Sequence, residues 1–143
     1  IQREWLLDMT ATTYSFATVT EMSGEMLKTV LEDVCDNLFN PDPYYQQGGD
    51  MVRVGGLSYV CKPNEKMGSR IGEMRLKGQL IEANKKYKVA GWAPVAEEAK
   101  TQNLKPVWEV VEQWLKASGG KVKARKLNTP KLEGVLPNPG YAA

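Results

Sequence analysis

The segment Glu25–Phe39, EMLKTVLEDVCDNLF, most strongly constrains what this chain can fold into. Its leucines and valines recur at helical spacing, at Leu27, Val30, Leu31, Val34 and Leu38. Ser23 stands where an N-cap is needed. Asn40-Pro41 ends the segment, because the residue before a proline avoids helical backbone angles. The sequence therefore predicts one well-bounded amphipathic helix.

Strand-like segments flank this helix, and a second helix follows them. Phe16–Met22 alternates and is rich in β-branched residues. Further strands are predicted at Met51–Val54, Leu57–Cys61, Arg70–Leu76, Gln79–Glu82 and Lys85–Ala90. Lys77-Gly78 is a two-residue turn that would make a hairpin. Pro106–Ala117 is amphipathic, with proline in its first turn and Gly119-Gly120 after its end.

The order of strand, helix, several strands and helix predicts an α+β domain with a mixed β-sheet and two main helices. We expect this domain to span residues 1–120, with Glu4–Met9 as one short helical turn. Residues 121–143, basic and then rich in proline and glycine, are expected to form an extended tail. Two helices cannot cover both faces of a sheet of this size, so part of it should face a partner domain.

Composition limits the classes of function. A chain of 143 residues suits one domain. The net charge of +2 does not indicate a nucleic-acid partner, and no apolar run is long enough to indicate a membrane span. The first residue, Ile1, is not methionine, so we expect a fragment of something longer. The chain has no histidine and two cysteines, so we expect it to bind no metal or cofactor of its own.

The connection from Asn40 to Gly56, NPDPYYQQGGDMVRVGG, is dense in prolines, glycines and polar side chains. One interpretation is a tight turn, in which proline fixes φ, glycine supplies positive φ and Asp caps. The other is the wall of a binding channel, in which phenol and amide groups hydrogen-bond a peptide or an oxyanion. The candidate residues for that wall are Tyr44, Tyr45, Gln46, Gln47 and Asp50.

Three stretches resemble the C-terminal domain of the 5′-nucleotidase family: VTEMSGEMLKTVLEDV, GGDMVRVGGLSYVCKPNEKMGSRI and NKKYKVAGWAP. The resemblance covers roughly residues 12 to 100. Within the family, LEDVCDNLFNPDPYYQQGGDMVRVGG, KMGSRI, YKVAGWAPV and RKLNTPKLEGVLPNPG are similar to the SoxB branch, the thiosulfohydrolases of bacterial sulfur oxidation (Sox). Long sequence segments that occur in the same order are a specific indication of such a resemblance.

The resemblance implies one half of a two-domain hydrolase. An N-terminal metallophosphatase domain, absent from this chain, would hold two manganese ions and carry out the hydrolysis. The C-terminal domain would shape the substrate channel, and the fragment alone would be inactive. The substrate in this branch is a cysteine-bound sulfonate on the SoxYZ carrier, released as sulfate in the periplasm.

One departure separates two alternatives inside the family. Nucleotidases carry an aromatic residue and then Asn-Gly-Gly-Asp-Gly-Phe after the Tyr-Lys-Val strand, where this chain has Pro94 and EEAKTQ at 97–102. The departure favours the thiosulfohydrolase over a nucleotide hydrolase. A stand-alone binding module with no catalytic parent is the third interpretation.

The resemblance also singles out residues outside the Asn40–Gly56 connection. Tyr14 and Trp92 lie in the two loops that face substrate in the family, although core or interface packing is the commoner role for a tryptophan such as Trp92. Cys35 and Cys61 would be small buried apolar residues or, in a periplasmic parent, a disulfide. A catalytic thiol is not expected, because no histidine is present to activate one. Arg70 would grip a sulfonate or, more commonly, form an ion pair.

Overall fold

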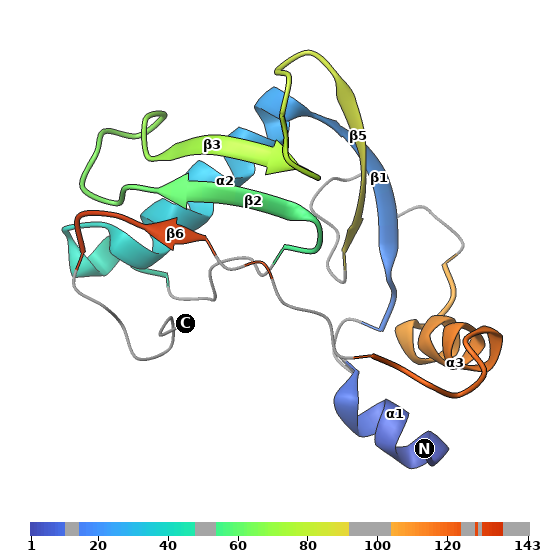
Figure 1. Ribbon diagram of the computed structural model, residues 1–143. Helices are drawn as coiled ribbons and strands as arrows, with labels where there is room; N and C mark the ends of the chain where they lie inside the picture. The colour runs from blue at the N-terminus through green and yellow to red at the C-terminus, as the bar shows by residue number, and fades with distance from the viewer. Residues whose placement is uncertain (11–14, 48–53, 92–103, 124–127, 129, 136–143) are drawn as a thin grey trace. The chain divides into compact units, whose positions relative to one another are not determined.

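A computed structural model describes residues 1–10, 15–47, 54–91, 104–123, 128 and 130–135 (Figure 1). The chain divides into two compact units. The first comprises residues 1–22 and 87–125, and the second comprises residues 23–86 and 126–143. Each unit is described by itself below.

The described residues of the first unit form two helices and a two-stranded sheet. The helices are α1 (Arg3–Met9) and α3 (Val107–Ala117), and the strands are β1 (Thr18–Ser23) and β5 (Lys86–Gly91). The hydroxyl of Thr18 donates to the carbonyl of Gly91 at 3.3 Å, which ties the start of β1 to the end of β5. The backbone N–H of Val107 donates to the carbonyl of Ser15 at 2.6 Å, so the start of α3 is anchored beside β1.

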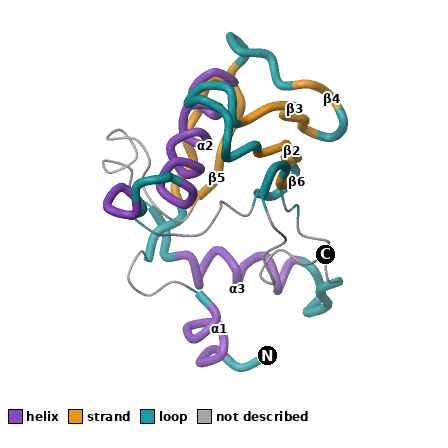
Figure 2. The backbone as a smooth tube through the Cα atoms, turned by 90° about the vertical axis from the view of Figure 1, so that its left-hand side faces the viewer, coloured by secondary structure: helices purple, strands orange, loops and turns teal. Residues whose placement is uncertain are grey.

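The second unit places one helix on a mixed four-stranded sheet. The helix is α2 (Gly24–Phe39), and the strands are β2 (Leu57–Cys61), β3 (Ile71–Leu76), β4 (Gln79–Leu80) and β6 (Lys131–Leu132). The strand order is β4-β3-β2-β6, with β2–β3 and β3–β4 antiparallel and β2–β6 parallel. Figures 1 and 2 show α2 on one face of this sheet. The predicted α+β class with a mixed sheet is confirmed.

The core of the second unit lies between α2 and the sheet. Its buried residues come from one face of the helix and the inward face of β2 and β3: Leu31, Cys35, Tyr59, Cys61, Ile71 and Met74. Residues of α2 at the predicted helical spacing, together with Leu132 of β6, pack against this cluster. Burying this apolar surface is the main term that holds the helix on the sheet.

The start of α2 is fixed by three contacts. The hydroxyl of Ser23 accepts the backbone N–H of Met26 at 3.1 Å, as the predicted N-cap requires. The N–H of Gly24 donates to the carbonyl of Lys85 at 3.1 Å, and the N–H of Glu25 donates to Ala83 at 3.0 Å. A Cβ on Gly24 would overlap the carbonyl oxygen of Glu82, so glycine is needed for this close approach.

The predicted hairpin turn is also confirmed. Lys77 and Gly78 both have positive φ, 52° and 84°, which matches the right-handed twist of the flanking strands β3 and β4. The predicted strand Met51–Val54 falls mostly outside the described residues, and Val54 forms an isolated bridge with Asn128.

A short strand in the C-terminal residues had no counterpart among the predicted elements. Lys131 and Leu132 form β6, which pairs in parallel with Val60 and Cys61 of β2. The N–H of Glu133 continues the pairing with a 2.9 Å hydrogen bond to the carbonyl of Cys61. The sheet of the second unit is therefore completed by residues near the end of the chain. Within the described part of the chain, no helix is both long and apolar enough to cross a bilayer.

Candidate functional site

Four of the seven residues predicted to line a channel lie together on the turn that follows α2. Tyr44 and Tyr45 belong to η1 (Pro43–Tyr45), a single 3₁₀ turn, and Gln46 and Gln47 come directly after it. The side chain of Tyr44 is 95% exposed and that of Tyr45 is 63% exposed. The other three candidates, Tyr14, Asp50 and Trp92, lie outside the described residues, as do Pro94 and residues 97–102.

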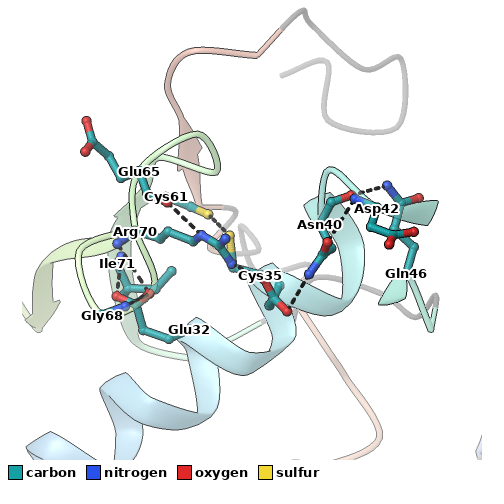
Figure 3. Close-up of polar contacts among 11 residues, drawn as sticks. Glu32, Cys35, Asn40, Asp42, Gln46, Cys61, Glu65, Gly68, Arg70 and Ile71 are labelled. Atoms are coloured by element: carbon teal, nitrogen blue, oxygen red, sulfur yellow. Dashed lines mark hydrogen bonds and ion pairs between the residues drawn. The ribbon is translucent and has the colours of Figure 1, made fainter. Parts of the chain in front are cut away.

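The turn is held by a chain of side-chain hydrogen bonds, several of which Figure 3 shows. The side-chain oxygen of Asn40 accepts the N–H of Asp42 at 2.9 Å, and the Asp42 carboxylate accepts the N–H of Tyr44 at 3.0 Å. The Gln46 amide donates to the carbonyl of Asn40 at 2.7 Å, which closes the turn. The Asn40 amide also donates to Asp36 at 2.9 Å, which ties the turn to the last turns of α2.

This arrangement presents two aromatic side chains to solvent from a fixed backbone. Tyrosine combines a large apolar face with a hydroxyl and loses little conformational entropy when it is held. Tyr44 and Tyr45 are therefore suited to contact a peptide or another protein surface. Gln46, in contrast, uses its amide within the turn itself.

A buried carboxylate organises the loop between β2 and β3. Glu32 of α2, which is 4% exposed, accepts backbone N–H groups of Gly68 at 2.9 Å, Arg70 at 3.3 Å and Ile71 at 2.8 Å (Figure 3). The ammonium group of Lys28 donates to the carbonyl of Gly68 at 2.7 Å. These contacts fix the loop 62–70 on α2.

Arg70 is buried and paired, so it is not free to grip an anion. Its guanidinium donates to the Asp36 carboxylate and, through Nε, to the carbonyl of Glu65 at 2.9 Å. The Arg70 guanidinium and, after it, the Asn40 amide hold the pKa of the Asp36 carboxyl below its ordinary value. Of the two interpretations of Arg70 from sequence, the structure shows the ion pair.

The two cysteines meet in the core. The Sγ atoms of Cys35 on α2 and Cys61 on β2 are 3.0 Å apart, and neither residue has exposed surface (Figure 3). The contact with Cys61 lowers the pKa of the Cys35 thiol, aided by the Arg70 guanidinium. The contact with Cys35 and burial raise the pKa of the Cys61 thiol.

Sequence reasoning did not single out Glu32 or Asp36, and it assigned Asn40 only to the end of the helix. Their signal was present as polar residues at helical spacing: Glu32, Asp36 and Asn40 follow one another along one side of α2 and its C-cap, with Glu32 buried and the other two half-buried. A buried polar residue in a helix face needs a partner, and here the partners come from the loop 62–70 and the η1 turn.

Two hollows lined by described residues do not include any of the predicted channel residues. One of about 330 Å³ is lined by α2 and the loop 62–70, including Lys28, Asp33 and Met67. Another of about 450 Å³ lies between α1 and the C-terminal end of α3. Among the described residues, no group of three or more histidine, cysteine, aspartate or glutamate side chains could hold a metal ion.

Two of the solved structures that are similar to this chain differ in how much they show about it. The structure titled sulfate thiohydrolase SoxB from Thermus thermophilus, in complex with glycerol, is 34% identical with a TM-score of 0.73, over 87% of this chain. A putative 5′-nucleotidase from Staphylococcus aureus, in complex with α-ketoglutarate, has a TM-score of 0.54 over 82% of this chain. It is 15% identical and therefore shows similarity of fold alone.

This chain matches only part of each relative, so the activity of the whole relative does not extend to it directly. This chain spans 23% of the SoxB chain and 27% of the 5′-nucleotidase chain. No protein of curated function matches the chain significantly. The family profile described as "5′-nucleotidase, C-terminal domain" matches residues 7–103, which is more than half of the chain. The chain belongs to the 5′-nucleotidase C-terminal domain family.

Proposed function

We propose that this chain is the C-terminal, substrate-channel domain of a SoxB-type thiosulfohydrolase. The single observation that carries the proposal is the 34% identity to a protein described as sulfate thiohydrolase SoxB, over 87% of this chain. The relative described as a 5′-nucleotidase is 15% identical. The sequence that replaces the nucleotidase motif at 97–102 points the same way.

In this proposal the hydrolysis belongs to an N-terminal metallophosphatase domain. The described residues of this chain offer no cluster of metal ligands, and the whole sequence has no histidine. Two manganese ions would therefore be held by that other domain. The complete enzyme would release sulfate from a cysteine-bound sulfonate on the SoxYZ carrier, in the periplasm.

The contribution of this chain would be to receive the carrier. Tyr44 and Tyr45 are exposed on a turn that side-chain hydrogen bonds of Asn40, Asp42 and Gln46 hold in place. Exposed aromatic side chains on a pre-organised backbone are common anchors in protein interfaces. The proposal assigns to them contact with the carrier polypeptide near the cysteine that bears the sulfonate.

The test uses the two-domain enzyme with Tyr44→Ala and Tyr45→Ala, singly and together. Sulfate release from loaded SoxYZ and capture of SoxYZ are measured side by side. We expect the double variant to lose about tenfold in capture, the equivalent of roughly 1.4 kcal/mol. Leu80→Ala is the control, because Leu80 is 58% exposed on β4, outside the turn.

Two results would contradict different parts of the proposal. Unchanged capture by the double variant would remove the tyrosines from the carrier site and leave the thiosulfohydrolase assignment standing. Release of phosphate from nucleoside monophosphates, without release of sulfate from the carrier, would replace the assignment with nucleotide hydrolysis. No hydrolytic activity in any polypeptide containing this chain would favour a stand-alone binding module.

A further inference from the structure

Cys35 and Cys61 are the two cysteines of the 143-residue chain, and the fold brings them together. They are 26 positions apart in sequence and come from different elements, α2 and β2. Their Sγ atoms are 3.0 Å apart, and both residues are 0% exposed. Figure 3 shows the two sulfur atoms directed toward each other.

The surroundings of the pair exclude other uses of two thiols. Neither sulfur is accessible, so neither can act on an external substrate in the folded chain. The described residues around them do not form a metal-ligating group of three. As thiols they would share only a weak S–H···S contact, since a thiol is a poor donor and a poor acceptor.

We propose that Cys35 and Cys61 form a disulfide that joins α2 to β2. The inference rests on the geometry of this unit and does not depend on the proposed function. The bond would enclose residues 36–60, which include the η1 turn that carries Tyr44 and Tyr45. The cross-link would therefore hold both ends of the segment that presents these tyrosines.

The reaction is a thiol–disulfide exchange with an external disulfide, either a small molecule such as oxidised glutathione or a dithiol oxidase of the compartment. Either cysteine can begin the exchange; if Cys35 does, its thiolate attacks one sulfur of that disulfide, forming a mixed disulfide and releasing one thiolate. The Cys61 thiolate then attacks the Cys35 sulfur, forming the new bond and releasing the second thiolate. Two electrons pass to the external disulfide, and the two thiol protons go to the two released thiols.

Burial of both sulfur atoms indicates that the disulfide forms early in folding. Because both sulfurs are inaccessible in the folded chain, the exchange must take place before α2 docks on β2, or during a local opening. Once formed, the bond is protected from reductants by the same burial. The result is a stable structural cross-link.

The direct test counts thiols on the unmodified chain. The protein is refolded with a mixture of reduced and oxidised glutathione, denatured without reductant, alkylated and weighed by mass spectrometry. We expect no alkylated cysteine in this sample and two after prior reduction, with a Cys35–Cys61 cross-linked peptide after proteolysis. Two alkylated cysteines in the unreduced sample would overturn the proposal.

A second measurement does not require a variant to fold. Samples refolded with glutathione and samples refolded in excess reductant are heated in parallel. The oxidised chain should unfold roughly 10 °C higher, since the bond removes loop-closure entropy from the unfolded chain. Equal unfolding temperatures would count against a stabilising cross-link. The variant with both Cys35→Ala and Cys61→Ala should show no dependence on reductant.

Discussion

The carboxylate of Glu32 accepts a 2.8 Å hydrogen bond from the backbone N–H of Ile71, 39 residues further along the chain. The same carboxylate accepts the N–H groups of Gly68 and Arg70. One buried side chain of α2 therefore supplies the hydrogen-bond acceptors for three backbone N–H groups at the end of the loop 62–70 and the start of β3. Because a carboxylate has acceptors and no donors, it suits a position that faces three donors.

Glu32→Gln is expected to lower the free energy of unfolding by about 2–3 kcal/mol, because the new NH₂ group faces buried N–H donors that it cannot bond. Urea unfolding measures the change. Asp33→Asn is the matched control, since Asp33 is the next residue on the helix and is exposed. A Glu32→Gln variant as stable as this control would show that the loop does not depend on the carboxylate.

Asp36 should make the second unit sensitive to acid. The Arg70 guanidinium and the Asn40 amide hold the pKa of this carboxyl below its ordinary value of 3.8. A depressed pKa in the folded state contributes stability above the ordinary pKa, and that stability is lost as the pH falls through the lower pKa of the folded state.

Asp36→Asn tests this contribution. The variant should be less stable than the unmodified chain at neutral pH, and the difference should shrink as the pH falls below 3.8. Midpoints of urea unfolding from neutral pH to pH 2 give the comparison. A difference that stays constant over this range would show that the charge of Asp36 contributes nothing.

Gly24→Ala is expected to destabilise the chain by about 1–3 kcal/mol, because the added Cβ meets the carbonyl of Glu82 and lies 2.6 Å from Cγ2 of Ile81. Thermal unfolding measures the effect. Gly72→Ala on β3 is the control, since a Cβ there has no neighbour within 4 Å. Equal effects of the two substitutions would mean that α2 can shift away from residues 81 and 82 at little cost.

Asp42→Ala should loosen the η1 turn without changing the exposed tyrosines. The Asp42 carboxylate accepts the N–H of Tyr44 at 3.0 Å, and loss of such a cap costs about 1 kcal/mol. Hydrogen exchange of the Tyr44 amide should therefore become about fivefold faster. Asp42→Asn keeps an acceptor oxygen and should restore most of the protection. Unchanged exchange in Asp42→Ala would assign the order of the turn to other contacts.

Features that depend on neighbouring residues could be predicted from the sequence. The helix over Glu25–Phe39 and its Ser23 cap follow from side-chain spacing and from a hydrogen bond that spans three residues. The Lys77-Gly78 turn follows from the φ values that these two positions require. Each of these signals lies within a few residues of the structure that it specifies.

Features that depend on distant partners could not be predicted in this way. In the sequence Glu32 does not differ from other acidic residues, because the backbone groups that it binds, in residues 68–71, are brought to it only by the fold. Nothing in the spacing of Cys35 and Cys61 indicates that their sulfurs meet. Strand β6 has two residues, too few to show alternation, and it forms because β2 offers an unpaired edge.

That pairing has a consequence for how the protein is made. Because translation proceeds from the N-terminus, β2 leaves the ribosome long before Lys131 and Leu132, the residues that cover its second edge. Until those residues are made, the nascent sheet ends in an open strand, the kind of surface that pairs with other chains. Pairing of this edge of β2 therefore waits for Lys131 and Leu132, and a chain cut before Lys131 would leave the edge open to pairing with other chains.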